Sequence, residues 1–222
     1  MPEKKIVAHF IRGFLGPTET FIGNQLRSLS RYEPVVYCRE IQPGHSYEDI
    51  KVRDVPGLLP PALRGLEALS YSAFRWLSPV AVRALVDDVR RSGASVLHFH
   101  FLVDARFFIR VCHALRLPAV VSAYGYDVGY FPGVWGGFGM KYLRPVFEEA
   151  DIFLAMSEDM RRDLIALGCP AEKVIVHYHG ICVERFLTPS RTYEMPLGER
   201  ALSSSTRYSP VRESRTRSIP AI

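Results

Sequence analysis

The chain has 222 residues, of which 48% are hydrophobic and 23% charged, a composition typical of a globular protein rather than a disordered one. Its net charge is +5, but residues 188–222 hold six Arg and three Glu, so the preceding residues carry a net charge of only +2. A nearly neutral body gives no compositional argument for nucleic acid or any other polyanion as a partner.

The cysteines and the apolar segments indicate a soluble chain of the cytoplasm. The four cysteines form no Cys-x-x-Cys pair, which argues against zinc-ribbon and thioredoxin motifs and favours buried, reduced thiols. The first ten residues lack a signal-type hydrophobic region. No apolar stretch approaches the ~20 residues needed to span a bilayer.

Short apolar runs alternate with segments of helical periodicity along most of the chain. This alternation predicts an α/β fold with a Rossmann-like, doubly wound, mostly parallel sheet flanked by helices. We expect strands at residues 5–10, 35–38, 95–101, 118–123, 151–156 and 173–178, with helices at 18–29, 82–92, 104–115 and 158–167.

Residues 56–77 lie outside this repeat, and many of them are apolar. With Arg64 and Arg75, the segment has the composition of an amphipathic helix on a membrane surface, or of a helix packed on the sheet. The low number of basic residues favours the packed helix.

Residues 188–222 differ abruptly from the rest of the chain. Eleven of these residues are Ser or Thr, and no helical or strand period is present, so the segment is too polar to fold alone. We therefore expect one domain over residues 1–187 and a disordered or non-native tail over 188–222. A truncation or a shifted reading frame would explain the break.

Ligands of open parallel sheets bind beyond the carboxyl ends of the strands. The first such loop holds Gly13 and Gly16 just before a helix start, where backbone N–H groups can approach a phosphate. Turn glycines without a ligand are the alternative. Neither G-x-G-x-x-G nor a P-loop motif is present, and no acidic residue ends the predicted second strand, so the sequence argues against an NAD enzyme or a P-loop NTPase.

The loop after Ala123 combines six glycines with several aromatic residues and Asp127. Aromatic faces beside a carboxylate suit the ring and hydroxyl groups of a carbohydrate, whereas the alternative is a surface loop whose aromatic side chains cover the core. We predict carbohydrate binding at this loop.

Four histidines alternate on two predicted strands, at positions 98, 100, 177 and 179. Residues i and i+2 of a strand share a face, so the geometry would allow a four-imidazole metal site. No carboxylate accompanies them, and histidines at strand ends more often form hydrogen bonds with loops or ligands. We therefore predict no metal site, and we assign His100 to substrate binding. The pair Ser157-Glu158 is explained by helix capping.

Several motifs in order resemble the N-terminal domain of family 4 glycosyltransferases, in particular the bacterial exopolysaccharide and colanic-acid-type enzymes. The resemblance covers about residues 5–187. It is carried by TETFIGNQLRSL (18–29), VLHFHF (96–101), SAYGYDV (122–128), ADIFLAMSEDMRRDLIALGCPAEKVIVHYHGI (150–181) and ERF (184–186).

The resemblance implies a GT-B enzyme that needs no metal or other cofactor and transfers a hexose from a nucleotide sugar to a hydroxyl group with retention at the anomeric carbon. The N-terminal domain would hold the acceptor, a saccharide that is lipid-linked at the cytoplasmic face of the membrane. By position, the family's catalytic groups correspond to Tyr124 and Asp127. Its substrate-binding groups correspond to Gly16, Thr18, Glu19, Thr20, Gly125, Ser157, Glu158 and Gly180.

The sequence departs from the family pattern in three places. Tyr124 replaces the usual histidine, Cys182 replaces the aspartate of a Gly-Ile-Asp element, and the nucleotide-binding second domain does not follow. We therefore expect this chain alone to transfer no sugar. The alternative function is a non-catalytic α/β module that binds carbohydrate or another protein.

Overall fold

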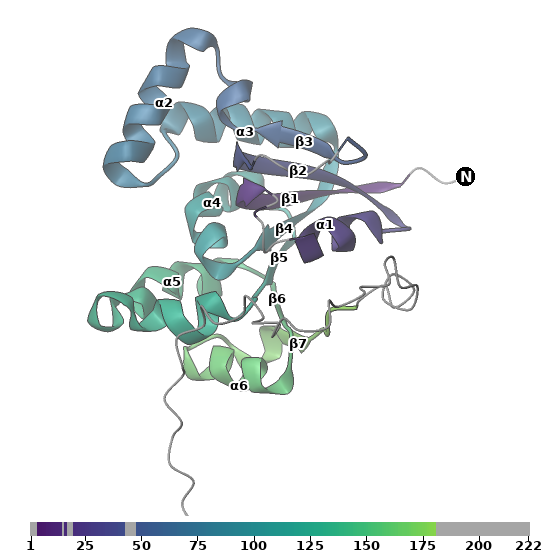
Figure 1. The fold of residues 1–222 in the computed structure, drawn as a ribbon, viewed down its shortest axis with the longest axis vertical. Helices are drawn as coiled ribbons and strands as arrows, with labels where there is room; N and C mark the ends of the chain where they lie inside the picture. Colours follow the sequence, from purple (N-terminus) through teal and green to yellow (C-terminus); the bar gives the residue numbers. More distant parts are fainter. Residues whose placement is uncertain (1–3, 15, 17–19, 43–47, 181–222) are drawn as a thin grey trace, which may run out of the picture. The chain divides into compact units, whose positions relative to one another are not determined.

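The computed structural model describes residues 4–14, 16, 20–42 and 48–180 (Figure 1). The chain divides into two units, Met1–His179 and Gly180–Ile222. The predicted tail and its boundary after residue 187 lie outside the described residues. All described strands and helices belong to the first unit.

Seven parallel strands form one sheet in the order β3-β2-β1-β4-β5-β6-β7. The predicted Rossmann-like, doubly wound fold is therefore confirmed. The strands are β1 (Lys5–Phe14), β2 (Tyr32–Ile41), β3 (Lys51–Asp54), β4 (Ala94–His100), β5 (Ala119–Ser122), β6 (Ile152–Ala155) and β7 (Val174–Val176).

The helices cover the sheet unequally. In Figure 1, α1 lies on the opposite side of the sheet from α4 and α5. Right-handed crossovers account for this arrangement, because the strand order reverses direction at β1. The helices are α1 (Thr20–Arg27), α2 (Pro61–Phe74), α3 (Pro79–Ser92), α4 (Leu102–Leu115), α5 (Phe138–Glu149) and α6 (Glu158–Ala166).

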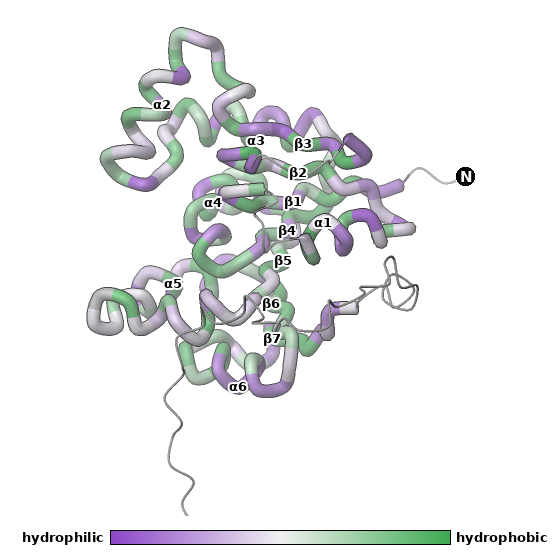
Figure 2. The backbone as a smooth tube through the Cα atoms, viewed as in Figure 1, coloured by the Kyte–Doolittle hydropathy of each residue, from purple (hydrophilic) through white to green (hydrophobic). Residues whose placement is uncertain are grey.

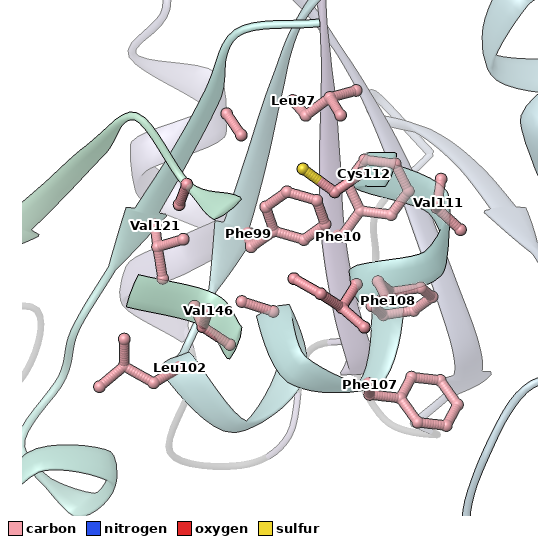
Figure 3. Close-up of a cluster of buried hydrophobic side chains, with 14 of the residues drawn as sticks. Phe10, Leu97, Phe99, Leu102, Phe107, Phe108, Val111, Cys112, Val121 and Val146 are labelled. Atoms are coloured by element: carbon pink, nitrogen blue, oxygen red, sulfur yellow. The ribbon is translucent and has the colours of Figure 1, made fainter. Parts of the chain in front are cut away.

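The larger hydrophobic core lies between the sheet and α4 (Figure 3). Phe10 of β1 and Phe99 of β4 stack at 4.8 Å between ring centroids, and Phe108 of α4 packs onto Phe10 at 5.3 Å. A smaller core on the other face joins Ile22 and Leu26 of α1 to strands β1 and β2. The apolar periodicity that predicts each helix thus marks the face that it buries.

Helix ends follow the signals in the sequence. Ser157 caps α6, because its Oγ accepts a hydrogen bond from the Met160 N–H at 3.1 Å. Gly93 ends α3 in the left-handed conformation, with φ of 73°. The predicted cap Thr18 lies outside the described residues, and α1 begins at Thr20.

Several elements differ from the prediction. Strand β1 extends to Phe14 and β2 to Ile41, beyond the predicted ends at residues 10 and 38. The segment predicted as a glycine-rich loop forms helical turns over Tyr126–Tyr130 and Phe131–Gly137, and α5 follows it. Strand β3 was not predicted, because its charged residues alternate on an exposed edge.

Helix α2 projects from the sheet (Figure 1), and among its apolar side chains Tyr71 packs against the core, on Phe107 of α4. The one buried residue of α2 is Glu67, whereas Leu66, Leu69 and Phe74 are each more than 60% exposed. The expectation that residues 56–77 pack on the sheet is therefore met by Leu59, Tyr71 and Leu77, whereas most of α2 is exposed. None of the helices in the described ranges has the length and apolar character to cross a bilayer.

Candidate functional site

A cleft of about 730 Å³ opens at the carboxyl ends of β1, β2, β4 and β5. The order of the strands reverses direction at β1. Open α/β sheets bind ligands beyond the carboxyl ends of the strands at such a point. Five aromatic residues line the cleft together with polar and charged groups: Phe21, Tyr71, Phe101, Tyr124 and Tyr126 beside Arg12, Arg39, Glu40, Gln42 and Asp104. This combination of apolar faces and a few polar groups is typical of small-molecule sites.

The glycine loop forms one wall of the cleft. Gly13 and Gly16 both line it, and a Cβ atom at Gly13 would lie 3.4 Å from Nε2 of Gln42. Thr20 is exposed as the first residue of α1. Thr18 and Glu19 lie outside the described residues, so their predicted roles stay predictions.

Tyr124 lines the cleft at the end of β5, as the strand-end rule predicts. Its hydroxyl lies 2.8 Å from Nδ1 of His100 and 3.4 Å from Oε1 of Gln25. His100 itself is fully buried and does not line the cleft. The structure thus places His100 behind Tyr124, where it can orient the phenol.

Asp127 is fully buried and does not line the cleft. Its carboxylate accepts hydrogen bonds from the backbone N–H of Leu102 at 2.7 Å and of Tyr124 at 3.0 Å. Burial raises the pKa of this carboxyl group, while the two N–H donors act in the opposite direction. In the described structure Asp127 therefore fixes the start of α4 to the end of β5, and its catalytic assignment stays a prediction.

Three buried imidazoles lie together beneath Tyr124, from His9 on β1 and from His98 and His100 on β4. Nδ1 of His9 is 3.1 Å from Nε2 of His100, and Nε2 of His98 is 2.8 Å from Oγ of Ser122. Burial lowers the pKa of all three rings, to about 4 for His98, so they are neutral near pH 7.

The cluster differs from the set of four histidines that the sequence suggested. His9 joins His98 and His100, whereas His177 is exposed and His179 stacks on Tyr124 at 5.2 Å between ring centroids. The His100 ring stacks on those of His9 and His98, with interplanar angles of 22° and 28°. One nitrogen from each of the three rings lies within 4.8 Å of the other two, so the predicted absence of a metal site stays a prediction.

Two arginines, Arg12 of β1 and Arg39 of β2, also line the cleft. Arg12 donates to the buried Asp104 from its Nε at 2.5 Å and from its backbone N–H at 2.8 Å. Burial raises the pKa of Asp104, although Arg12 opposes the shift. The guanidinium of Arg39 lies 3.4 Å from the centroid of the Tyr71 ring.

The remaining predicted residues lie elsewhere. Gly125 precedes the turn at Tyr126 with φ of 98°, a conformation that favours glycine. Ser157 caps α6 and Glu158 is exposed in its first turn, and neither lines the cleft. Gly180 begins the second unit, so its predicted contact with substrate stays untested.

The sequence reasoning missed Arg39, Glu40 and Tyr71. The strand-end rule would have found the first two if it had been applied to β2, which runs three residues past its predicted end. Glu40 also corrects the expectation that no acidic residue ends this strand. Tyr71 reaches the cleft from α2, a tertiary contact that no local pattern predicts.

Solved structures share this fold. Anabaena HepE in complex with UDP-glucose is 14% identical to the chain, with a TM-score of 0.57 over 81% of this chain and 45% of the HepE chain. The complex of HepE with UDP and glucose is 15% identical, with a TM-score of 0.56 over 82% of this chain and 46% of HepE. The chain thus spans less than half the length of HepE.

No curated protein matches the chain. The fold is the Rossmann-like arrangement that makes up one half of a GT-B architecture. The sequence profile of Glycosyltransferase Family 4 matches residues 19–185, well over half of the sequence. The chain therefore belongs to Glycosyltransferase Family 4.

Proposed function

We propose that the cleft binds the saccharide acceptor of a retaining hexosyltransferase in polysaccharide biosynthesis. The observation that carries the proposal is the lining of the cleft, where five aromatic rings surround guanidinium, amide and phenol groups in a chain of family 4. Aromatic rings cover the apolar face of a sugar, and the polar groups can pair with its hydroxyls.

Tyr126 is the residue best placed to stack on such a sugar. It lines the cleft, is 53% exposed, and is supported from behind by Tyr130, whose ring centroid is 5.5 Å away. A large exposed aromatic side chain costs free energy in water, and a bound sugar ring would remove much of that cost.

The donor in this proposal is a nucleotide sugar, such as the UDP-glucose that HepE binds. Gly13 and Gly16 leave room for its diphosphate near the start of α1, where backbone N–H groups favour an anion. Tyr124, which corresponds to one catalytic group of the family and lines the cleft, would face the transferred hexose, and the buried Asp127 would hold the Tyr124 backbone in position. The other half of the nucleotide site would come from a second Rossmann-like domain.

Titration of the 222-residue chain with methyl glucoside and short glucose oligosaccharides, followed by ¹H–¹⁵N NMR, tests acceptor binding. We expect shifts for residues around the cleft, and we expect Tyr126→Ala to weaken binding at least fivefold. Tyr32→Ala is the matched control. Tyr32 is also an exposed tyrosine, at 39%, but it lies at the start of β2, at the opposite end of that strand from the cleft. Equal weakening in both variants, or shifts confined to residues outside the cleft, would contradict the proposal.

A lipid-linked acceptor fits the exposed surface of α2, and we include contact with an anionic bilayer in the proposal. Leu66 and Leu69 are 61% and 66% exposed, and Arg64 and Arg75 accompany them. Figure 2 shows that apolar and neutral residues predominate along this projecting helix. Tyr71 of the same helix lines the cleft, so a bilayer bound at α2 would hold a lipid-linked sugar near it.

Sedimentation with vesicles tests this contact. We expect the chain to bind vesicles that contain phosphatidylglycerol more strongly than vesicles of phosphatidylcholine alone, and the double variant Leu66→Ser/Leu69→Ser to lose most of that binding. Val80→Ser is the control, because Val80 is 45% exposed on α3. Unchanged sedimentation of the double variant would remove α2 from the proposal.

A further inference from the structure

Among the described residues that line the cleft, Arg12 and Arg39 have one buried carboxylate near them, that of Asp104. The β1–β2 register pairs Ile11 with Cys38 and Gly13 with Glu40, so Arg12 and Arg39 lie opposite each other on neighbouring strands. Side chains at paired positions of a parallel sheet point to the same face, about 5 Å apart at their origins. The two guanidinium groups therefore enter the cleft side by side.

Arg12 is neutralised, because it pairs with Asp104 through both its side chain and its backbone N–H. Arg39 forms no ion pair with any described residue, and its buried Nε has no hydrogen-bond partner among them. Buried side-chain donors nearly always have a hydrogen-bond partner, so this unpaired group beside the cleft calls for an explanation, which a bound ligand would supply.

Aromatic packing against Tyr71 holds the Arg39 side chain in place. The face of Tyr71 supports the Arg39 guanidinium at 3.4 Å, and Arg75 lies 5.2 Å from the centroid of the same ring. Positive charge thus accumulates around Tyr71. Glu40, the next residue of β2, also lines the cleft, but it is exposed and makes no ion pair with the described residues.

We propose that the acceptor carries an acidic group, a carboxylate or a phosphate, that binds Arg39 beside Arg12. A planar guanidinium donates two parallel hydrogen bonds to two oxygens of such an oxyanion, which a neutral hydroxyl group cannot match. This inference rests on the proposed acceptor function of the cleft and adds the chemical class of the acceptor.

The test measures dissociation constants of the 222-residue chain by NMR titration with four probes: methyl glucuronoside, glucose 6-phosphate, methyl glucoside and inorganic phosphate. We expect at least one of the two acidic sugars to bind tenfold or more tightly than methyl glucoside, and more tightly than inorganic phosphate. Whichever acidic sugar binds more tightly distinguishes a uronate from a phosphorylated acceptor.

Three variants assign the effect to Arg39. Arg39→Gln should abolish the preference for the acidic sugar, and Arg39→Lys should retain part of it, because the charge remains but the planar fork is lost. Arg83→Gln, which removes an exposed arginine of α3 outside the cleft, should leave it unchanged. The Lys variant keeps the test valid if the Gln variant fails to fold.

The possible failures are distinguishable. Equal affinity for methyl glucoside and the acidic sugars, with shifts at the cleft, would overturn this inference and leave the acceptor function intact. An acidic preference that survives in Arg39→Gln would also overturn it. If inorganic phosphate binds as tightly as glucose 6-phosphate, the cleft holds an anion without recognising a sugar, and the inference of an acidic acceptor is overturned. The absence of cleft shifts with any sugar would overturn the proposed function itself.

Discussion

His98 belongs to a cluster of three buried imidazoles that must remain neutral in the folded protein. Burial lowers the pKa of His98 to about 4, with smaller contributions from His177 and His179, whereas an unfolded histidine titrates near 6.5. As the pH falls below about 6.5, the unfolded chain binds protons that the folded chain excludes. The free energy of unfolding should therefore decrease from pH 6.5 down to about pH 4.

Chemical denaturation at several pH values checks this expectation. Between pH 6.5 and 4, the free energy of unfolding of His98→Gln should decrease by about 3 kcal/mol less than that of the unmodified chain. The reason is that each unit of pKa shift corresponds to about 1.4 kcal/mol. Parallel pH profiles for the His98 variant and the unmodified chain would contradict the role of burial. The raised pKa values of Asp104 and Asp127 act in the opposite direction in both proteins.

Asp127 gives a second prediction, which separates structure from catalysis. Its two hydrogen bonds join Leu102 and Tyr124, so Asp127→Ala would leave two backbone N–H groups without an acceptor. We expect Asp127→Ala to lower the free energy of unfolding, measured with urea, by about 3 kcal/mol. Asp127→Asn keeps one acceptor oxygen and should lose about half as much. Equal stability of the Ala variant and the unmodified chain would show that the buried carboxylate supports neither backbone group.

Helix α5 packs closely against the turn that precedes it. A Cβ atom at Gly139 would lie 2.1 Å from the carbonyl oxygen of Phe131 and 3.0 Å from Cα of Pro132, so no larger residue fits without a shift of the backbone. Gly139→Ala should therefore destabilise the chain by about 2 kcal/mol. Gly133→Ala, in the same segment but with open space at its Cβ, should be nearly neutral. Thermal unfolding measures both, and equal melting temperatures would refute the packing argument.

The elements differ in how far local sequence determines them. Strand β4 was predicted well, because the β-forming residues Val96, Leu97 and Phe99 mark it even though buried histidines occupy its other face. Helix α5 was missed because glycines and Pro145 obscure its periodicity, and tertiary contacts stabilise it instead.

The site follows the same division. Gly16 and Tyr124 could be predicted from their positions after strands, whereas Arg39 was missed because β2 was assigned three residues too short. His9 joins the histidine cluster through the pairing of β1 with β4, with His9 directly opposite His98. The identity of neighbouring strands is a property of the topology, so the periodicity of a single strand cannot reveal it.

At the scale of the whole molecule, we predict that the 222-residue chain releases no UDP from UDP-glucose. In the proposed function, Gly13 and Gly16 would contribute one side of the diphosphate site, and effective catalysis requires fixed positive charge that converges on the leaving group. The measurement is UDP release in the presence of saccharide acceptors, with a two-domain family member as positive control. Release that rises in proportion to the concentration of the chain would contradict the prediction.

The central position of β1 also affects how the chain acquires its structure during synthesis. Ala8 pairs with Leu97, so the middle of the sheet cannot close until about ninety further residues have left the ribosome. Until then, the apolar side chains of β1 and β2 lack half of their partners, and contacts between residues so distant in sequence form slowly. The nascent protein is consequently most prone to aggregate before β4 emerges. Chaperones should bind it most during that interval of translation.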